Sequence, residues 1–579
     1  MTSSSHSLAD IQRRIDEVKR FLSLTLCIAN AHTVEFYTHD VWKRFVAVSP
    51  QEVLSTISSC GDQQREPEHK DREQFGTTFG FCNNTNRLVN PLELQQTATA
   101  HSLLNLGVCL SRDELLRALG EYKEEEGDEL EPDEFMNSKK SHEVQSMSKV
   151  VAFLAKHCGV KQVIDVGSGK GYLSSFLSLQ YGLSVYGIDS SSTNTHGAQE
   201  RNRKLKKFSR AYQKHLKAEM VPGEASDLPH EDVVEKNGED GSVSVIEETE
   251  EEVLAGFPEK NSGVKNHSEP HPETEALFLD ALSVDVVQTT PPRVPPSHLS
   301  AEERERRKRE NLERKDKNRT DSAKMFLPLT SYVTAETELR ELINELEDAV
   351  MVGLHTCGDL APSTLRMFVA KAELAAVCSV GCCYHLLSEE FDPARQECVQ
   401  GVCGFPLSQY LRHQSWFCGR NARMSACLAL ERVAVGQGIQ MESLFYRAVL
   451  HVILRDHYSS FKSEKRVGNV YSKAKSFVDY VQRALRRLEL DDSKLSDSDI
   501  QEYHNTYRPR IDEMLAFNML KVTLAPCIEG LILLDRLCYL KEQEDLSFSA
   551  LVQLFDPVLS PRCYAVVGLK SYDRSCLCE

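Results

Sequence analysis

The spacing of apolar residues changes along the chain, and it predicts helices first and an α/β domain afterwards. Near the start, apolar residues recur at intervals of four, three and four, at Ile11, Ile15, Val18 and Leu22. This is the period of one helix face. We therefore expect an N-terminal helical region over residues 1–120.

Beyond residue 135, helical patterns alternate with short apolar runs. Residues 135–213 contain two such runs, and residues 325–404 contain three more. Alternation of this kind is typical of α/β proteins with a parallel sheet. The two ranges are expected to be the first and second halves of one domain.

The last part of the chain breaks this alternation. Residues 405–545 have helical spacing almost throughout, and residues 546–579 hold two apolar runs, a Pro-containing turn between them and a tail. The two runs predict an antiparallel C-terminal hairpin at the edge of a mostly parallel, seven-stranded sheet. A helical insertion before such a hairpin lies over the edge where α/β proteins bind ligands, so residues 405–545 are predicted to be a helical substrate cap.

Charge divides the chain further. Residues 121–134 are strongly acidic and predict a linker. The formal net charge of the chain is -18, and most of it lies in the stretch 219–252, which contains 13 Asp/Glu and one Lys. Its neighbours are rich in Pro, Ser and Gly, so residues 214–324 are predicted to be a disordered insert, acidic first and basic at its end. The rest of the chain is only mildly acidic, which argues against a globally basic nucleic-acid binder.

Composition also bears on where the protein resides. The chain has 18 Cys among 579 residues, and charged residues stand where a signal peptide would have its apolar core. No uninterrupted apolar run approaches the roughly 18 residues of a membrane span. A protein of this size does not need disulfides, so its thiols are expected to be reduced. We expect an intracellular protein, cytoplasmic or nuclear, with no membrane partner.

The first apolar run of the α/β domain ends in a glycine-rich turn. In the segment VIDVGSGKGYL, Gly167, Gly169 and Gly171 occupy alternate positions. Three glycines between a strand and a helix indicate a sharply bent backbone that leaves space for a ligand. Asp189 ends the next apolar run, where a carboxylate can accept hydrogen bonds from both hydroxyls of a ribose.

The spacing excludes two common nucleotide motifs. It is not the dinucleotide fingerprint G-x-G-x-x-G, and it is not a phosphate loop, because Lys170 is followed by Gly171. With Asp165 two residues before the first glycine, the segment resembles motif I of class I S-adenosylmethionine-dependent methyltransferases. That resemblance implies a Rossmann-like fold and S-adenosyl-L-methionine as cofactor. The residues it implies in cofactor binding are Asp165, Gly167, Ser168, Gly169, Gly171 and Asp189.

Within that resemblance the cofactor-binding residues have separate roles. The glycine turn takes the methionyl part, Asp165 fixes the turn and the amino group, and Asp189 binds the ribose. The activated methyl group then needs mainly an aligned acceptor, with a general base only where the acceptor carries a proton.

Polar residues follow the fourth and fifth predicted strands, where the acceptor should lie. Their segments are LHTCGDL at 354–360 and VGCCYH at 380–385. Together with KKSHEV at 139–144 and SPR at 560–562, they resemble the methyltransferase-like protein 25 family. The resemblance covers residues 135–213 and 325–579, implies a methyltransferase and leaves the acceptor open. The catalytic candidates at matching positions are His355, Asp359, Cys382, Cys383 and Tyr384.

The chemistry of these candidates is open between four interpretations. In the first, His355 or Asp359 accepts a proton or hydrogen bond from the acceptor while Tyr384 orients it. In the second, zinc is bound by thiols and imidazoles, but the usual Cys-x2-4-Cys pairs are missing and we expect no metal. In the third, a thiolate attacks a base as in RNA 5-methylcytosine enzymes, whose Asp-x-Pro-Cys and Thr-Cys motifs are absent. In the fourth, the thiols are core residues. The residues of the zinc alternative are His355, Cys357, Cys382, Cys383 and His385.

On the helix before the first strand, a packing or capping role is expected for His142 and Glu143 at least as much as contact with the cofactor.

After the fourth strand, the chain lacks the Asn/Asp-Pro-Pro-aromatic motif of enzymes that methylate adenine amines. RNA and protein acceptors both stay open. The alternative is a non-catalytic scaffold with the same fold, because a fold does not by itself establish chemistry.

Basic residues gather in one part of the predicted cap and suggest an anionic partner. Eight Lys/Arg stand against two acidic residues over 462–487, with Tyr471 and Tyr480 among them. Such a segment can bind RNA phosphates and stack bases, although a solvated helix face has the same composition. The basic residues are Lys462, Lys465, Arg466, Lys473, Lys475, Arg483, Arg486 and Arg487.

Overall fold

The computed structural model describes residues 6–59, 78–82, 84–120, 136–203, 326–393, 402–434, 441–458 and 467–571. The predicted linker at 121–134 and the predicted insert at 214–324 lie outside these ranges.

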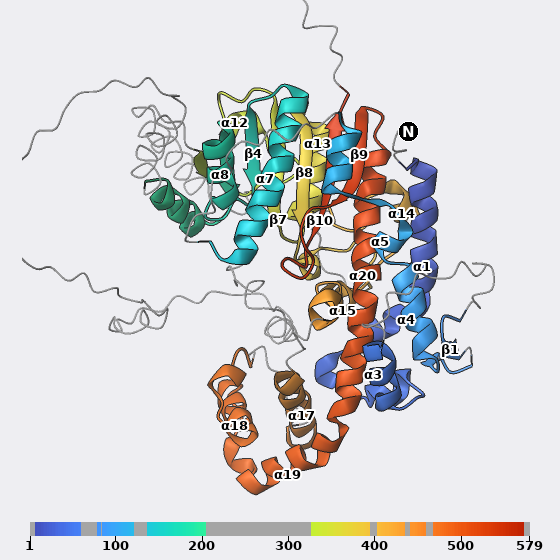
Figure 1. Cartoon of the computed structure of the whole chain (residues 1–579). Coiled ribbons are helices and arrows are strands. Elements are labelled where there is room, and N and C mark those ends of the chain that lie inside the picture. Colours follow the sequence, from blue (N-terminus) through green and yellow to red (C-terminus); the bar gives the residue numbers. More distant parts are fainter. Residues whose placement is uncertain are drawn as a thin grey trace, which may run out of the picture. The chain divides into compact units, whose positions relative to one another are not determined.

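An eight-stranded sheet forms the centre of the described chain (Figure 1). Its strand order is β3-β9-β10-β8-β7-β4-β5-β6, and β10 runs antiparallel to both of its neighbours. The mostly parallel sheet with an antiparallel hairpin is confirmed, and the predicted number of strands was one too low. The strands are β3 (Cys109–Ser111), β4 (Gln162–Val166), β5 (Ser184–Asp189), β6 (Leu327–Thr330), β7 (Ala349–Thr356), β8 (Leu374–Gly381), β9 (Leu546–Gln553) and β10 (Tyr564–Lys570).

The additional strand comes from the N-terminal region. β3 pairs in parallel with β9, three residues against three. A second short pairing in that region joins β1 (Phe81–Cys82) to β2 (Arg87–Leu88). Strands of two or three residues are too short for a period to be recognised, and the pairing of β3 depends on a partner more than 400 residues away in the sequence.

Helices cover both faces of the sheet, and successive strand residues divide between two cores. Val163 and Val350 point into one core with residues of α6, α7 and α8, whereas Ile164 and Met351 point into the other with residues of α13 and α20. The central strands are buried at nearly every position, which explains why they are apolar throughout and do not alternate. The helices are α6 (Arg112–Ala118), α7 (Ser138–Cys158), α8 (Tyr172–Tyr181), α12 (Leu339–Leu342), α13 (Leu360–Ala370) and α20 (Ile511–Lys541).

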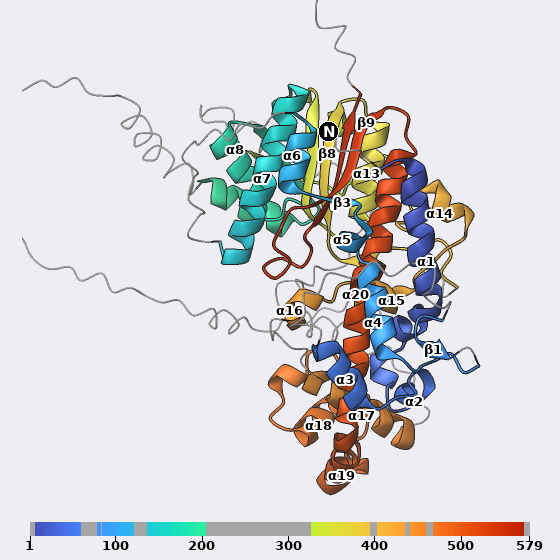
Figure 2. The same cartoon turned by 45° about the vertical axis from the view of Figure 1, so that its right-hand side comes forward.

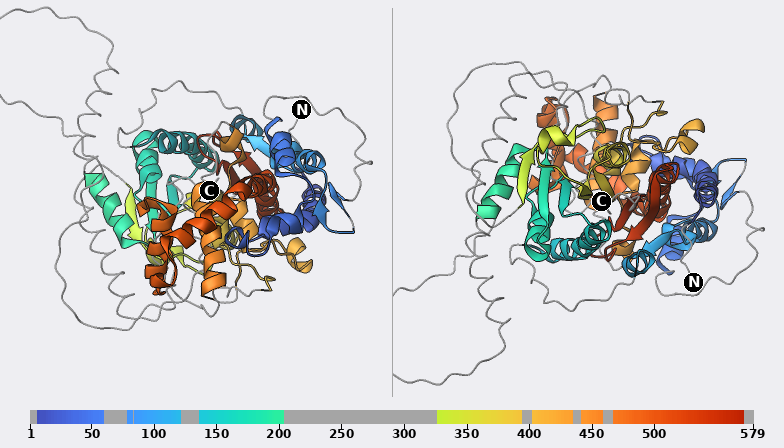
Figure 3. Two further views of the ribbon diagram at one scale, coloured as in Figure 1. Left: turned by 90° about the horizontal axis from the view of Figure 1, so that it is seen from below. Right: turned by 90° about the horizontal axis from the view of Figure 1, so that it is seen from above.

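The N-terminal helices pack along α20. The predicted apolar face of α1 is fully buried, and Ser7 and Asp10 begin this helix with a reciprocal capping box. Figures 2 and 3 show these helices, in blue, on the side of the sheet where β9 and β10, in red, lie next to the edge strand β3. They are α1 (Leu8–Asn30), η1 (Thr33–Glu35), α2 (Val41–Phe45), α3 (Pro50–Ser59), α4 (Pro91–Ala100) and α5 (Leu103–Leu106).

The stretch 497–541, which ends with α20, is long and apolar enough to cross a membrane by length and composition. However, 89% of its most apolar window is buried inside the protein. Burial on all sides explains why α20 is apolar around its whole circumference.

The residues predicted as one cap divide between two places. α15 packs against η5 (Tyr384–Leu386), directly after β8, whereas α17 packs against η1, α19 and α20. Figure 1 shows α17, α18 and α19 together at the end of α20 that lies away from the sheet. The role of residues 405–545 as a substrate cap stays a prediction, and within this range α17 and α18 are buried against other helices. The helices are α14 (Gln409–His413), α15 (Arg420–Ser425), α16 (Leu430–Ala434), α17 (Met441–His457), η7 (Tyr471–Lys473), α18 (Phe477–Arg487), η8 (Asp492–Lys494), α19 (Asp497–Tyr507) and η9 (Arg508–Arg510).

Candidate functional site

The glycine bend between β4 and α8 has a backbone that only glycine adopts readily. Gly167, Gly169 and Gly171 have φ angles of 71°, 56° and 74°. A Cβ at Gly171 would lie 2.8 Å from Cε2 of Phe326 and closer still to Cζ, so this glycine is needed for packing. A Cβ at Gly169 would meet nothing within 4 Å. The middle of the bend therefore faces open space, as a surface that receives a ligand must.

Asp189 lies directly at this bend. Its carboxylate accepts hydrogen bonds from the amide of Gly169 at 3.0 Å, the amide of Ser191 at 2.8 Å and Nδ2 of Asn194 at 3.2 Å. The amide of Gly167 also bonds to the carbonyl of Ile188 at 2.8 Å, which ties the bend to the end of β5. A carboxylate has about four acceptor positions, so the Asp189 side chain keeps capacity for a further donor.

Two polar side chains lie beneath the bend. Asp165 is buried in β4 and accepts a hydrogen bond from Oγ of Ser174 at 2.6 Å. Burial raises the pKa of Asp165 to about 7, with a smaller contribution from the charge of Asp189, against the hydrogen bond from Ser174 that lowers it. Oγ of Ser168 is buried without a hydrogen-bond partner. A buried hydroxyl without a partner costs free energy unless a ligand supplies one.

The structure thus brings together all of the predicted cofactor residues. Open space at Gly169, the unpaired hydroxyl of Ser168 and the remaining acceptor capacity of Asp189 fit a ligand that carries hydroxyl and amino groups. Their binding of S-adenosylmethionine stays a prediction.

The middle and last glycines of the bend, Gly169 and Gly171, provide matched variants. Gly171→Ala is expected to destabilise the fold by about 3 kcal/mol, because its Cβ overlaps the Phe326 ring and φ is positive. Gly169→Ala is expected to cost only about 1 kcal/mol, since its Cβ meets no atom, yet to weaken cofactor binding by roughly tenfold or more. Chemical denaturation and calorimetric titration measure the two effects. Normal cofactor affinity in a folded Gly169→Ala variant would contradict the role of the bend.

A buried carboxylate orients His355 at the end of β7. Glu143 of α7 is completely buried, and its Oε2 lies 3.0 Å from Nε2 of His355 and 2.9 Å from Nζ of Lys140. Its Oε1 accepts a hydrogen bond from Oγ of Ser560 at 2.7 Å. Burial opposes ionisation of Glu143, but the charges and hydrogen bonds of His355 and Lys140 outweigh it and hold the pKa of Glu143 below its usual value.

This cluster lies beside the glycine bend. A Cβ at Gly167 would be 3.6 Å from the carbonyl oxygen of His355, so β4 and β7 bring the two features together at one sheet edge. The side chains of His355 and Lys140 are 32% and 26% exposed, whereas Glu143 is inaccessible. The partly exposed imidazole of His355 is thus oriented by the buried carboxylate of Glu143.

Sequence reasoning found His355 and missed the role of its partners Lys140, Glu143 and Ser560. A usable signal was present, because Glu143 shares one helix face with Met147 and Val150, at spacings of four and seven, and a buried acid needs a cation. The neighbouring His142 packs near Phe555 and its Nε2 accepts from the amide of Asp556 at 2.9 Å.

Two catalytic candidates, Asp359 and Tyr384, form hydrogen bonds with other parts of the chain. Oδ1 of Asp359 accepts from the amide of Ser388 at 2.9 Å, which fixes the loop after η5. Burial raises the pKa of Asp359. Tyr384 is 1% exposed, and its hydroxyl donates to Oε1 of Glu529 at 2.8 Å. The predicted contacts of Asp359 and Tyr384 with an acceptor stay a prediction, and both groups already have hydrogen-bond partners elsewhere in the chain.

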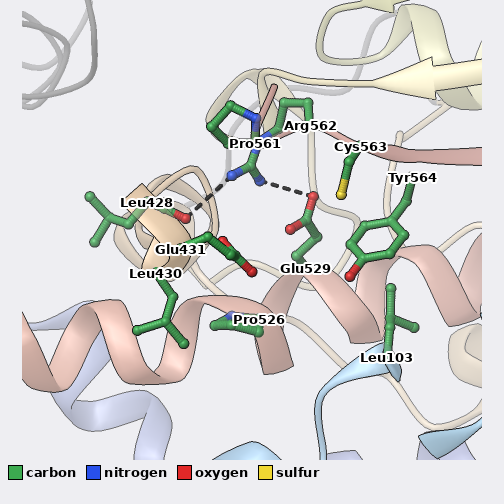
Figure 4. Close-up of a pocket in the computed structure, with 10 residues that line it drawn as sticks. All are labelled: Leu103, Leu428, Leu430, Glu431, Pro526, Glu529, Pro561, Arg562, Cys563 and Tyr564. Carbon is green, nitrogen blue, oxygen red and sulfur yellow. Dashed lines mark hydrogen bonds and ion pairs between the residues drawn. The ribbon is translucent and has the colours of Figure 1, made fainter. Parts of the chain in front are cut away.

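The pocket in Figure 4 is too small for a substrate. Its volume is about 20 Å³, which is room for one water molecule. Arg562 forms an ion pair with Glu529 at 2.9 Å across it and donates to the carbonyl of Leu428. Arg562 of the SPR segment thus fixes the position of Glu529 and, through it, of Tyr384. The lining residues are Leu103, Leu428, Leu430, Glu431, Pro526, Glu529, Pro561, Arg562, Cys563 and Tyr564.

The thiols after β7 and β8 converge. Sγ of Cys382 lies 2.9 Å from Sγ of Cys357 and 3.6 Å from Sγ of Cys383. The hydrogen bond with Cys357 and burial raise the pKa of both Cys382 and Cys383, although for Cys382 the hydrogen bond with Cys383 lowers it. A nucleophilic thiolate is disfavoured there, which argues against covalent attack on a base.

Comparison with known proteins agrees with this geometry. A family model described as a methyltransferase domain matches residues 139–390. "Probable methyltransferase-like protein 25" of Mus musculus is 48% identical over 595 residues, covering 97% of each chain. Its counterpart of the same name from Homo sapiens is 47% identical over 596 residues, covering 97% of this chain and 98% of that protein. The chain belongs to the methyltransferase-like protein 25 family. No solved structure matches it.

In this member of the methyltransferase-like protein 25 family, the matched domain contains the glycine bend, Asp189, the Glu143–His355 pair and the three converging thiols. Ser560, which completes the cluster around Glu143, lies beyond that domain in the closing hairpin. The chain is a methyltransferase by family, with the Rossmann-like fold expected of it.

Proposed function

We propose that the protein transfers a methyl group from S-adenosylmethionine to an acceptor in RNA or protein. The observation that carries this proposal is the hydrogen bond between the Gly169 amide and the Asp189 carboxylate, beside an imidazole that a buried carboxylate orients. A cradle for a nucleoside and a proton acceptor thereby lie at one edge of the sheet.

Each residue of the bend has a distinct task in this proposal. The remaining acceptor capacity of Asp189 takes a ribose hydroxyl, Oγ of Ser168 gains a partner, and Asp165 attracts the cationic amino group. When bound, the cofactor supplies a methyl group on a positively charged sulfur, which in-line attack by a nucleophile can remove.

His355 is the proposed proton acceptor. If Nε2 carries the proton and donates to Glu143, Nδ1 keeps a lone pair for the nucleophile's proton, and Glu143 stabilises the imidazolium that forms. If Lys140 donates to Nε2 instead, the proton sits on Nδ1 and the imidazole cannot act as a base through that atom. Lys140 therefore controls which tautomer is present.

The acceptor class is inferred from basic residues in the helical region after residue 470. On η7, on α18 and in the turn between them, Lys473, Lys475 and three arginines favour an anionic chain such as RNA. However, Arg483 pairs with Asp479 at 2.7 Å and Arg486 with Asp492 at 3.2 Å. Tyr480 is completely buried and cannot stack a base, contrary to the expectation from sequence. Lys462, Lys465 and Arg466 lie outside the described residues.

One experiment decides between enzyme and scaffold and also finds the acceptor. The purified protein is incubated with methyl-labelled cofactor and an extract of cells that lack the protein, and label is then sought in RNA and in protein. Label in either fraction, lost with Asp189→Ala, supports transfer. Cofactor binding without any label in RNA or protein would support the non-catalytic scaffold.

Asp165 predicts a pH dependence of cofactor affinity. Its carboxyl is largely neutral below its pKa of about 7 and charged above it, and only the charged form attracts an ammonium group. Affinity should therefore rise with pH, by about fivefold from pH 6 to pH 7, where an α-amino group stays protonated. Calorimetric titration at the two pH values measures this, and Asp165→Asn should remove the dependence. Affinity that falls over this interval in the unmodified protein would contradict the assignment.

A further inference from the structure

Three sulfur atoms meet at the carboxyl ends of two neighbouring strands. Sγ atoms of Cys357, Cys382 and Cys383 all lie within 4.8 Å of one another. No other group of three or more His, Cys, Asp or Glu residues in the described ranges converges in this way. Cys357 is partly accessible, whereas Cys382 and Cys383 are buried.

The sheet holds two of these thiols in fixed positions. Thr356, at the end of β7, is the register partner of Gly381, at the end of β8. Cys357 and Cys382 are therefore the first residues after each of these paired strands. The amide of Cys382 bonds to the carbonyl of Thr356, and Oγ1 of Thr356 donates to the carbonyl of Val380 at 3.0 Å. Ligands on paired strands with hydrogen-bonded neighbours lose little freedom when an ion binds.

We propose that Cys357, Cys382 and Cys383 bind one thiophilic metal ion, zinc(II) or copper(I), at the edge of the sheet. Two sulfurs on a tetrahedral zinc ion are about 3.8 Å apart, given Zn–S bonds of about 2.3 Å. The 3.6 Å between Cys382 and Cys383 is close to this value, and Cys357 and Cys382 would separate by about 1 Å from their 2.9 Å. Three sulfur ligands favour such ions over magnesium or calcium.

The charge balance of this site is favourable. Each thiol that binds loses its proton to water, so three S–H bonds are replaced by three sulfur–metal bonds and three protons are released. With zinc(II), the site then carries one net negative charge. The guanidinium of Arg536 lies against Gly381, the residue before Cys382, and supplies a buried positive charge.

The histidines of the sequence-based zinc alternative are engaged elsewhere. Nε2 of His355 lies between Glu143 and Lys140, and Nδ1 of His385 lies 3.8 Å from Sγ of Cys427. The proposed set therefore has three protein ligands, and a fourth position is left for water or another small ligand, as in zinc sites that keep an open position. The site does not depend on the proposed methyl transfer, because metal content is measured without cofactor.

Metal analysis of the full-length protein tests the proposal. The protein purified without chelator should contain about one zinc or copper ion per chain, and Cys357→Ser, Cys382→Ser and Cys383→Ser should each lower this at least tenfold. Cys158→Ser and Cys563→Ser are controls, matched in accessibility to Cys357 and to the buried pair, and should keep the metal. Retention of the metal in all three site variants would overturn the proposal.

A titration of the unmodified protein avoids variants that fail to fold. After removal of bound metal under reducing conditions, added Cd²⁺ should give sulfur-to-metal charge-transfer absorption that saturates at one equivalent, with an intensity of three thiolates. Absence of this absorption, or a Cys357–Cys382 disulfide in protein isolated without oxygen and alkylated before analysis, would overturn the proposal. Cofactor titration of the same samples reports separately on the proposed function.

Discussion

Asp189→Ala is expected to weaken S-adenosylmethionine binding about 100-fold, measured by calorimetric titration. The variant removes the acceptor for a ribose hydroxyl, and a hydrogen bond to a charged group is worth up to about 3 kcal/mol, which gives about two powers of ten. It also removes the acceptor of the Gly169 amide, so the bend loses one of its hydrogen bonds to the end of β5. Asp189→Asn keeps one acceptor oxygen and should lose only about tenfold.

A matched control separates loss of the ligand contact from loss of a local turn. Asp491 accepts from the amide of Ser493 at 3.0 Å, just as Asp189 accepts from the amide of Ser191, two residues further along the chain in both cases. Asp491→Ala should therefore alter local stability to a similar degree and leave cofactor affinity unchanged. Equal affinity in Asp189→Ala and Asp491→Ala, with both proteins folded, would refute the ribose assignment.

His355→Ala is expected to lower the rate of methyl transfer by about 100- to 1000-fold while cofactor affinity changes little. A positioned general base contributes on the order of 10²–10⁴ to rate, and His355 is the accessible member of the cluster around Glu143. Glu143→Gln should lower the rate less, because the imidazole stays in place and loses only the negative charge that stabilises its protonated form.

Single-turnover kinetics with saturating cofactor measure these rates once the acceptor is known. His157→Ala is the control. His157 lies on the last turn of α7, the helix that carries Glu143, and stacks on Phe153. A full rate in His355→Ala would show that the acceptor needs no base from this residue. Loss of cofactor binding in His355→Ala would instead assign the imidazole to the cofactor site.

The fold and the predicted cofactor site at the glycine bend and Asp189 could be predicted, because both depend on residues close together in the sequence. The bend needs glycine at positive φ within five residues, and Asp189 follows it at the end of the next strand. Buried parallel strands and amphipathic helices likewise show their period over short windows. These features depend on neighbours in sequence, so they are visible without a structure.

The surroundings of the residues predicted to contact the methyl acceptor could not be predicted in the same way, because their contacts join segments that are far apart in the sequence. Tyr384 appears as a polar aromatic after a strand, but Glu529 and Arg562 bury it from α20 and the closing hairpin. Asp359 is held by Ser388 across a loop. Glu143 gains its function from His355, more than 200 residues later in the chain. The position of α17–α19 also follows from packing on α20 and not from the order of elements.

Hydrogen exchange of the unmodified protein with and without S-adenosylhomocysteine tests the central claim most directly. The claim predicts slower amide exchange in peptides that contain residues 165–172 and 189–195, where the bend and Asp189 meet, and little change in α17–α19. Unchanged exchange at the bend in a folded protein, with saturating ligand, would contradict it.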